Sequence, residues 1–320
     1  MINVLEECKG ANVIGISGHV RPDGDCTGSV SALYQYLKKA LPDVQIELLL
    51  EKPSAVFADL PGYERMGRSF AKQTEFDVFF ILDSTQERIG FAEAHAKKAK
   101  KRINIDHHIS NPGTECDVNY VVPEASSTAE LVYELIGKEN LDAQIAKSIY
   151  IGMIHDTGVF QYSNTSPKTL RIAAQLLEYG FDFPKLIDET FYEKTYVQNQ
   201  ILGRALLESI LFMDGKCIAS MVDRKLMDFY QADSKDFEGI VNQLRVVKGV
   251  ECAIFMYETG TLEYKVSLRS CGAVDVSKVA EYFGGGGHVR AAGCMLSGTY
   301  HDVLNNLSRE IAKQMPGFQV

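Results

Sequence analysis

The first half of the chain alternates short β-rich runs with stretches that carry apolar residues at helical spacing. The β-rich runs are residues 13–17, 45–50, 77–82 and 102–105. Strands that alternate in this way with helices are typical of a parallel sheet covered by helices. The pattern predicts an α/β fold with a parallel sheet in the N-terminal part of the chain.

The second half has a different pattern, with strand-like runs close together and fewer helices between them. The runs are residues 209–212, 217–222, 251–258 and 262–270, and the last two are joined by Thr259-Gly260-Thr261 as in a hairpin. The pattern of the first half breaks at 180–184. We therefore expect a first domain at 1–185, a connecting helix at 186–208 and a smaller α+β domain at 209–320.

Composition narrows the class of protein. The 320 residues include 33 Lys+Arg and 42 Asp+Glu, a net charge of −9 that argues against broad non-specific binding of nucleic acid. Glu6 and Glu7 stand where a signal peptide would be basic, and no apolar run approaches the ~18 residues that span a bilayer. The seven cysteines include no CxxC pair, which favours free thiols without a catalytic role. We expect a cytoplasmic protein with no membrane partner.

Polar side chains gather where predicted strands and one helix end. His19, Asp23 and Asp25 follow the first run; Asp83 and Arg88 follow the third; Asp106, His107 and His108 follow the fourth; Asp156 ends a helix at about 142–155. Ligands bind at the carboxyl ends of strands in open parallel sheets, so the position of these residues is typical of a site.

Each residue alone has an ordinary structural explanation. Asp23 lies in a Pro-Gly turn, and Asp83 is placed to cap a helix. Together, however, about five carboxylates and three imidazoles in one crevice would repel one another unless cations neutralised them. Carboxylate and imidazole ligands without a thiolate suit two divalent ions, Mn²⁺ first, with Mg²⁺, Co²⁺ and Fe²⁺ as alternatives. Two such ions favour phosphoester hydrolysis.

These clusters, in this order, resemble the four motifs of the DHH phosphoesterases. The segment Gly284-Gly285-Gly286-Gly287-His288-Val289-Arg290-Ala291-Ala292-Gly293 resembles the GGGHxxAAG signature of the DHH-associated C-terminal domain and argues against a family II pyrophosphatase. The motifs extend from His19 to Gly293. A two-domain chain of this length is most similar to the nanoRNase/pAp-phosphatase branch.

The resemblance implies a role for each residue. One metal would be held by His19, Asp23 and Asp83, and the other by Asp25, Asp83, His107 and Asp156, so that Asp83 bridges. His108, Asp106 and Arg88 would be the catalytic residues, with Asp106 orienting the histidines. Exposed glycine amides and arginines suit phosphate. The substrate-binding residues would be Arg269, Gly285, Gly286, Gly287, His288 and Arg290, with the active site in the cleft between the domains.

The resulting functional hypothesis is a Mn-dependent phosphodiesterase and phosphatase. It would hydrolyse short oligoribonucleotides to nucleoside monophosphates and remove the 3'-phosphate of pAp by a metal-activated hydroxide. The partners would be short single-stranded RNA, dinucleotides and pAp, without long duplex nucleic acid, and a homodimer is left open. The alternatives are a phosphodiesterase for cyclic or linear dinucleotides and, as a non-enzyme, a nucleotide-binding sensor.

Overall fold

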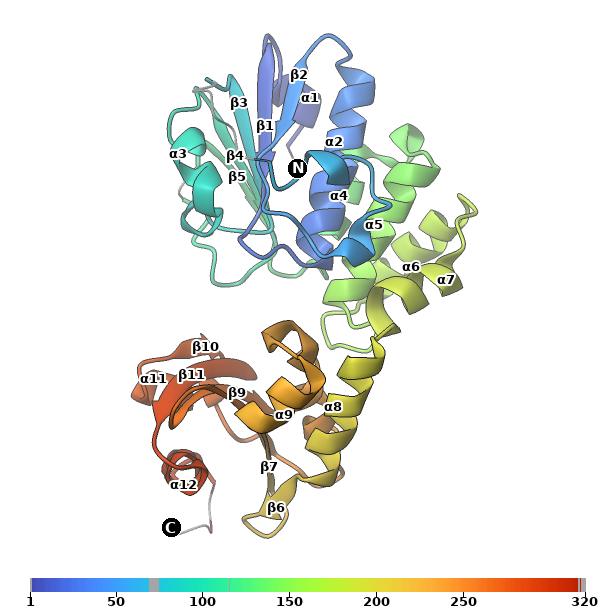
Figure 1. Cartoon of the computed structure of the whole chain (residues 1–320). Coiled ribbons are helices and arrows are strands. Elements are labelled where there is room, and N and C mark those ends of the chain that lie inside the picture. Colours follow the sequence, from blue (N-terminus) through green and yellow to red (C-terminus); the bar gives the residue numbers. More distant parts are fainter. Residues whose placement is uncertain (1, 69–74, 115, 316, 318–320) are drawn as a thin grey trace. The chain divides into compact units, whose positions relative to one another are not determined.

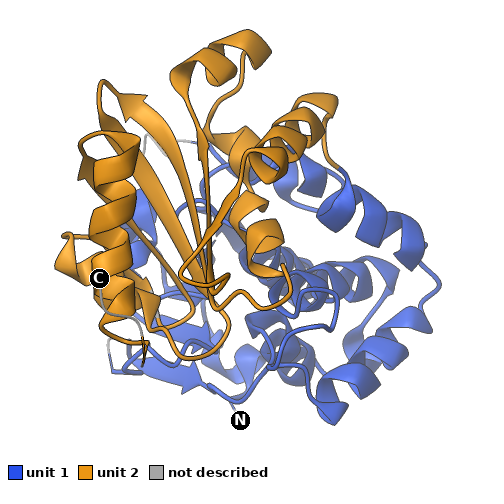
Figure 2. Cartoon of the chain, turned by 90° about the horizontal axis from the view of Figure 1, so that it is seen from below, with its two compact units in different colours: residues 1–193 blue, residues 194–320 orange. Residues whose placement is uncertain are grey.

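The structure, a computed structural model, describes residues 2–68, 75–114, 116–315 and 317. The chain divides into two compact units, Met1–Glu193 and Lys194–Val320 (Figure 2). This division falls inside the segment 186–208, which the sequence predicts to be a connecting helix. Within the described ranges, no helix has both the length and the apolar character required to cross a bilayer.

Unit 1 is built on the predicted parallel sheet. Its five strands have the order β2-β1-β3-β4-β5, and every neighbouring pair is parallel. The strands are β1 (Val13–Ser17), β2 (Gln45–Leu48), β3 (Val78–Leu82), β4 (Arg102–Asp106) and β5 (Val118–Val121). The sequence analysis did not predict β5, an edge strand of four half-buried residues without a fully apolar run.

Helices cover both faces of this sheet (Figure 1). The helices of unit 1 are α1 (Val4–Glu7), α2 (Gly24–Ala40), α3 (Glu93–Ala96), α4 (Thr128–Ile136), α5 (Ala143–Asp156), α6 (Pro167–Leu177) and α7 (Phe183–Ile187), followed by a π-helix (Asp188–Tyr192). Single 3-10 turns are η1 (Ala55–Phe57), η2 (Tyr63–Arg65), η3 (Gln86–Arg88), η4 (Gly90–Ala92) and η5 (Lys138–Asn140).

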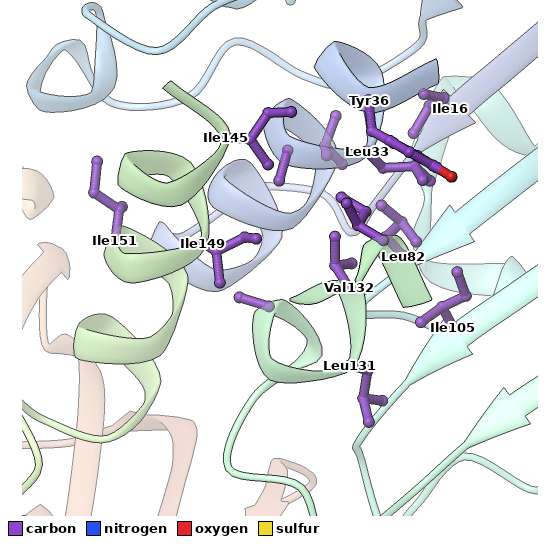
Figure 3. Packing of buried hydrophobic residues seen from close by; sticks show 14 of the residues in the cluster. Ile16, Leu33, Tyr36, Leu82, Ile105, Leu131, Val132, Ile145, Ile149 and Ile151 are labelled. Atoms are coloured by element: carbon purple, nitrogen blue, oxygen red, sulfur yellow. The ribbon is translucent and has the colours of Figure 1, made fainter. Parts of the chain in front are cut away.

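The side chains of β3 point alternately to the two faces of the sheet, so the core of unit 1 has two parts. Phe80 and Leu82 belong to the large cluster formed with α2, α4 and α5, whereas Phe79 and Ile81 belong to a smaller cluster on the side of α3. Successive side chains of a strand point to opposite faces, so a strand covered on both faces reads as a continuous apolar run. Figure 3 shows the larger cluster, where sheet residues such as Leu82 pack against helix residues such as Val132.

Helix α2 begins earlier than the sequence predicts. The helical spacing becomes clear only at about Ser29, but the helix starts at Gly24 because the side chain of Asp23 accepts a hydrogen bond from the Cys26 amide and caps it. Asp25 therefore lies in the first helical turn. The sequence Pro22-Asp23-Gly24-Asp25 is typical of a turn, but in the structure it leads directly into the first turn of α2.

Unit 2 contains a separate mixed sheet of six strands with the order β10-β11-β9-β8-β7-β6, in which only β7 and β8 are parallel. The strands are β6 (Ile210–Phe212), β7 (Cys217–Val222), β8 (Cys252–Gly260), β9 (Glu263–Ser270), β10 (Gly286–His288) and β11 (Ala291–Ser297). The helices are α8 (Tyr196–Leu207), α9 (Arg224–Tyr230), α10 (Ile240–Arg245), α11 (Val276–Tyr282) and α12 (Tyr300–Ala312), with the 3-10 turn η7 (Ser234–Phe237). The predicted β8–β9 hairpin is present.

The glycine-rich segment is partly a strand. Gly286, Gly287 and His288 pair with β11, and a Cβ at Gly287 would meet the backbone of Ala291 and Ala292. Gly287 also has a φ of +150°, which favours glycine. The close approach of β10 to β11 is therefore one structural reason for a glycine in this segment.

Candidate metal centre

The predicted ligands of unit 1 follow the carboxyl ends of β1, β3 and β4. The chain passes from β1 to the edge strand β2 and then returns to the other side of β1 to form β3. Such a reversal between adjacent parallel strands leaves a crevice at their carboxyl ends, where ligands bind. His19 follows β1 and Asp83 follows β3, so these two residues flank the crevice.

Asp83 lies at the middle of the cluster and its two carboxylate oxygens face different histidines. Oδ2 is 3.4 Å from His19 Nε2, and Oδ1 is 3.7 Å from His107 Nε2. Oδ1 also accepts a hydrogen bond from the Thr128 hydroxyl at 3.0 Å. Asp83 is 3% exposed and has a φ of 54°, a left-handed conformation that Asp tolerates better than most residues. This arrangement suits a carboxylate shared by two cations.

The imidazoles of His19 and His107 are oriented alike. His19 Nδ1 lies 2.9 Å from the Val20 carbonyl oxygen, and His107 Nδ1 lies 3.3 Å from that of Ala125. In the neutral ring, a nitrogen beside a carbonyl oxygen carries the proton, which leaves the lone pair on Nε2 for a cation. In both residues Nε2 is the atom that faces Asp83. This is the usual arrangement of metal-binding histidines.

Asp106 is buried and orients His108. Its Oδ1 accepts hydrogen bonds from the amides of His107 and His108 and lies 2.7 Å from His108 Nδ1. Its Oδ2 accepts from Asn111 Nδ2 at 2.6 Å, and the same amide group also donates to Asn104 Oδ1. The carboxylate of Asp106 is therefore used to position the turn and the ring of His108.

Asp23 and Asp25 combine structural contacts with a place in the cluster. Asp23 caps α2 and has Oδ1 3.6 Å from His19 Nε2. Asp25 is fully buried; it accepts hydrogen bonds from the amides of Thr128 and Ala129 at the start of α4, and its Oδ2 is 3.9 Å from His107 Nε2. The sequence suggests ordinary turn chemistry for Asp23, but its side chain caps α2, and the residue still lies beside His19.

Asp156 joins the cluster from the end of α5. Its Oδ2 is 3.4 Å from His107 Nε2 and accepts a hydrogen bond from Asn164 Nδ2 at 3.2 Å. The turn that follows is unusual, because Gly158, Val159 and Phe160 all have positive φ values near 55–65°. Thr157 holds this turn, since its hydroxyl oxygen accepts a hydrogen bond from the Phe160 amide at 3.1 Å.

The neighbour of Asp156, His155, packs against the backbone between Asp23 and Asp25. A Cβ at Gly24 would overlap the ring of His155. On its other sides this ring makes edge contacts with Phe57 and Phe191, with centroid distances of 5.1 Å and 5.4 Å. His155 is therefore a packing residue that holds two ligand-bearing segments together.

The electrostatics of the cluster favour bound cations. Burial, with Asp83 and Asp23 adding to it and His107 partly opposing it, raises the pKa of Asp156 to about 6. Burial and the nearby Asp83 and Asp156 also raise the pKa of Asp25. Burial opposes the charged form of His19, but hydrogen bonds to Asp23 and Asp83 outweigh it and raise the pKa of the ring. Without cations, protons have to balance the crowded negative charge.

The donor atoms fit divalent cations. Among the residues that the structure describes, three groups of side chains place their donor atoms within 4.8 Å of one another, and Asp83 or His107 belongs to each group. The groups are His19, Cys26 and Asp83; Asp83, His107 and His108; and Asp25, His107 and Asp156. Except for one thiol, the donors are the oxygen and nitrogen atoms that suit Mn²⁺ and Mg²⁺.

The other predicted site residues lie on different elements. Arg88 is exposed in η3, and its carbonyl oxygen accepts a hydrogen bond from the Val20 amide at 2.8 Å, which joins the loops after β1 and β3. In unit 2, Arg269 is the penultimate residue of β9, and its Nη1 donates to the Leu268 carbonyl at 3.0 Å. Arg290 lies between β10 and β11, where Nη1 donates to the Gly272 carbonyl. The side chain of His288 lies outside the part of the chain that the structure describes.

Sequence reasoning missed several residues that support the cluster, namely Cys26, Asn104, Asn111, Thr128 and Asn164. Asn111 offered a weak signal, because it follows three polar residues after a strand. Thr128 and Asn164 come from other parts of the chain and belong to residue types that are common in caps and loops. Only the fold reveals that they contact Asp83 and Asp156.

Comparison with known proteins identifies the family. Residues 13–153 match the model of the DHH family N-terminal domain, and residues 214–315 match that of the DHHA1 domain. A protein of Thermus thermophilus named bifunctional oligoribonuclease and PAP phosphatase NrnA is 32% identical over 317 residues, which cover 94% of this chain and 90% of the relative. The chain belongs to the DHH family.

Other DHH proteins agree with this assignment. A protein of Bacillus subtilis with the same name is 27% identical over 284 residues, 87% of each chain. The crystal structure of an exopolyphosphatase-related protein from Bacteroides fragilis superposes with a TM-score of 0.88 at 27% identity and covers 97% of this chain and 94% of that one. The resemblance seen in the sequence is thus confirmed, and the fold is that of the DHH phosphoesterases with a DHHA1 domain.

Proposed function

We propose that this DHH protein is a two-metal phosphoesterase that hydrolyses short oligoribonucleotides to nucleoside monophosphates and removes the 3'-phosphate of pAp. The observation that carries the proposal is the placement of Asp83, whose two oxygens face His19 and His107 separately. The substrate class is supported by the oligoribonuclease and PAP phosphatase names of two relatives that share 32% and 27% identity over most of the chain.

In this proposal His19, Asp23 and Asp83 hold one cation, and Asp25, Asp83, His107 and Asp156 hold the other, with Mn²⁺ as the expected ion. When bound, such a pair of cations activates water and stabilises the entering and leaving oxygens of a phosphoryl transfer. The carboxylates and rings of this chain supply the fixed geometry. Asn164 and Thr128 keep Asp156 and Asp83 oriented through the hydrogen bonds described above.

His108 supplies a proton to the leaving oxygen. Its hydrogen bond with Asp106 raises the pKa of the ring, which favours the protonated form of His108. The side chain is 32% exposed, whereas Asp106 behind it is fully buried. A protonated, partly exposed imidazole held by a buried carboxylate suits a general acid. Arg88, exposed in η3 after the same strand as Asp83, binds an oxygen of the phosphate.

The residues of unit 2 bind the part of the substrate away from the scissile phosphate. Arg269 and Arg290 supply positive charge, and the glycines of 285–287 let a phosphate approach the backbone closely, although the Gly285 amide itself donates to the Ala280 carbonyl oxygen. With His288, these residues select a substrate of a few nucleotides in place of a long duplex. The overall charge of −9 repels phosphates, so binding depends on these local groups.

The test is hydrolysis of a matched panel with Mn²⁺: a 5'-phosphorylated dinucleotide, a five-nucleotide RNA, a 24-nucleotide RNA, pAp and a cyclic dinucleotide. We expect rapid turnover of the short RNAs and pAp and little cleavage of the longest RNA. Preference for the cyclic dinucleotide would replace the proposal with a signalling phosphodiesterase. Binding without turnover on any member of the panel would replace it with a nucleotide sensor.

A further inference from the structure

One thiol lies within the candidate metal centre. Cys26 is fully buried in the first turn of α2, directly after Asp25. Its Sγ, a ring nitrogen of His19 and a carboxylate oxygen of Asp83 all lie within 4.8 Å of one another. The thiol therefore shares a group of donor atoms with His19 and Asp83, whereas His107 belongs to the other two groups.

The local backbone leaves room for this thiol. Gly18 immediately precedes His19, and a Cβ at this position would collide with Cys26 Sγ. The Cys26 amide donates a hydrogen bond to Asp23 Oδ1 at 3.1 Å, which fixes the first turn of α2. The residue that holds Cys26 in place is thus itself a predicted ligand on the same side of the cluster.

The spacing of the neighbouring donors fits one cation. His19 Nε2 lies 3.4 Å from Asp83 Oδ2 and 3.6 Å from Asp23 Oδ1. Donor atoms around a four-coordinate cation are about 3.5 Å apart when the bonds are about 2.1–2.3 Å long. Cys26 would add a donor to such a cation, because its sulfur and one atom each of His19 and Asp83 lie within 4.8 Å of one another.

Buried cysteines often have no role beyond packing, and Cys8 is an example in the same hydrophobic cluster. Cys8 is 2% exposed, but among the described residues it belongs to none of the groups of donor atoms. Cys26 differs because its sulfur faces two other donors. The pair therefore offers one test residue and one matched control.

We propose that Cys26 Sγ is a donor to the cation held by His19, Asp23 and Asp83, so that the two cation positions of the site differ in chemical softness. Sulfur favours Co²⁺, Fe²⁺ and Zn²⁺ over Mg²⁺, whereas Asp25, His107 and Asp156 offer only oxygen and nitrogen. When the sulfur–metal bond forms, the S–H bond breaks and the proton leaves to solvent. The inference rests on the two-metal centre of the proposed function.

The direct test is to titrate the metal-free full-length protein with Co²⁺ and record its near-ultraviolet absorption. We expect a sulfur-to-cobalt charge-transfer band in the wild type and in Cys8→Ser, and no such band in Cys26→Ser or Cys26→Ala. Absence of the band in the wild type, although dialysis shows bound Co²⁺, would overturn the proposal. Persistence of the band in either Cys26 variant would do the same. Circular dichroism checks that each variant is folded.

A second measurement compares dissociation constants. Loss of an outer-sphere partner typically weakens metal binding by roughly 10- to 100-fold. Loss of a sulfur that binds the metal directly should weaken Co²⁺ binding in Cys26→Ser by at least as much. Mg²⁺ binding should change little. Equal weakening of both ions would show that Cys26 only supports the fold. Neither measurement uses turnover, so hydrolysis of short RNA by a protein without the band would leave the proposed function intact and reject this inference alone.

Discussion

The Thr128 hydroxyl donates a hydrogen bond to Asp83 Oδ1 at 3.0 Å, and the Thr128 amide donates to Asp25 Oδ2 at 2.7 Å. One residue at the start of α4 thus orients two carboxylates that come from different strand ends. Because Oδ1 is fixed by Thr128, Oδ2 remains on the side of His19. The N-terminus of α4 therefore determines how the Asp83 carboxylate is oriented.

Asp83→Asn should abolish most turnover because an amide cannot neutralise and bridge two cations. The loss should exceed the roughly 100-fold that removal of an outer-sphere partner causes. Asn also tolerates the left-handed backbone of residue 83, so the fold should persist. Hydrolysis of a dinucleotide and thermal unfolding are the measurements, with Asp59→Asn, 87% exposed, as control. Near-normal turnover by metal-loaded Asp83→Asn would refute the bridging role.

Thr128→Val should weaken metal binding without disturbing α4, because valine keeps the shape of threonine but lacks its hydroxyl. Loss of an outer-sphere hydrogen bond typically costs about 10- to 100-fold in metal affinity or activity. Mn²⁺ titration followed by electron paramagnetic resonance measures the affinity. Thr128→Ser restores the hydroxyl and should recover most of the loss. An equal loss in both variants would indicate that packing at residue 128 matters instead.

Stability should depend on pH in a direction set by Asp156. Its folded pKa of about 6 lies above the ordinary value of 3.8, so the folded metal-free protein holds a proton that the unfolded chain releases between these pH values. Stability from this group is therefore lost as pH rises from about 4 to 6. Bound Mn²⁺ replaces the proton and should raise the melting temperature more at pH 7 than at pH 5.

Melting curves with EDTA and with Mn²⁺ at the two pH values measure this effect. In Asp156→Asn the position carries no titrating group, so the metal-free protein should lose less stability between pH 5 and pH 7 than the wild type does. An equal loss in the variant and the wild type would assign the pH dependence to other residues.

Substitution of Arg269 or Arg290 by alanine should affect both substrate binding and stability. Arg269→Ala should raise KM for short RNA with little change in kcat, since the proposed contact lies away from the scissile phosphate. Each variant should also lower the free energy of unfolding by about 1 kcal/mol, because Arg269 donates to the Leu268 carbonyl and Arg290 to that of Gly272. Steady-state kinetics and denaturant unfolding separate the two effects. A fall in kcat alone for Arg269→Ala would place this residue at the reacting phosphate.

Many residues of the candidate metal centre could be predicted because they directly follow predicted strands. His19, Asp83 and His107 follow apolar runs, and a parallel sheet brings such residues to one edge. The start of α2 could not be predicted, because a Pro-Asp-Gly sequence is equally typical of a turn, and only the contact of Asp23 with the Cys26 amide decides between the two. Local sequence determines the strand ends, whereas the choice between a turn and the start of a helix at Asp23 depends on the conformation that the chain adopts there.

The glycine-rich segment of unit 2 is a second place where the structure could not be predicted from the local sequence. Four consecutive glycines indicate a loop, yet Gly286 and Gly287 pair with β11, because the absence of side chains permits a close approach that the sequence does not reveal. The contact between Asn164 and Asp156 could not be predicted from the sequence either. The chain between these two residues includes a turn in which Val159 has a left-handed backbone conformation. Propensity alone would not place a valine there.

The contact between Gly24 and His155 has a consequence for sequence variation. The His155 ring fills the space beside Gly24, so any side chain at position 24 would overlap this ring. A larger residue between the two aspartates is therefore compatible with this fold only where the residue before Asp156 is smaller or takes another rotamer. Among relatives, these two positions should covary although 131 residues separate them along the chain (155 minus 24).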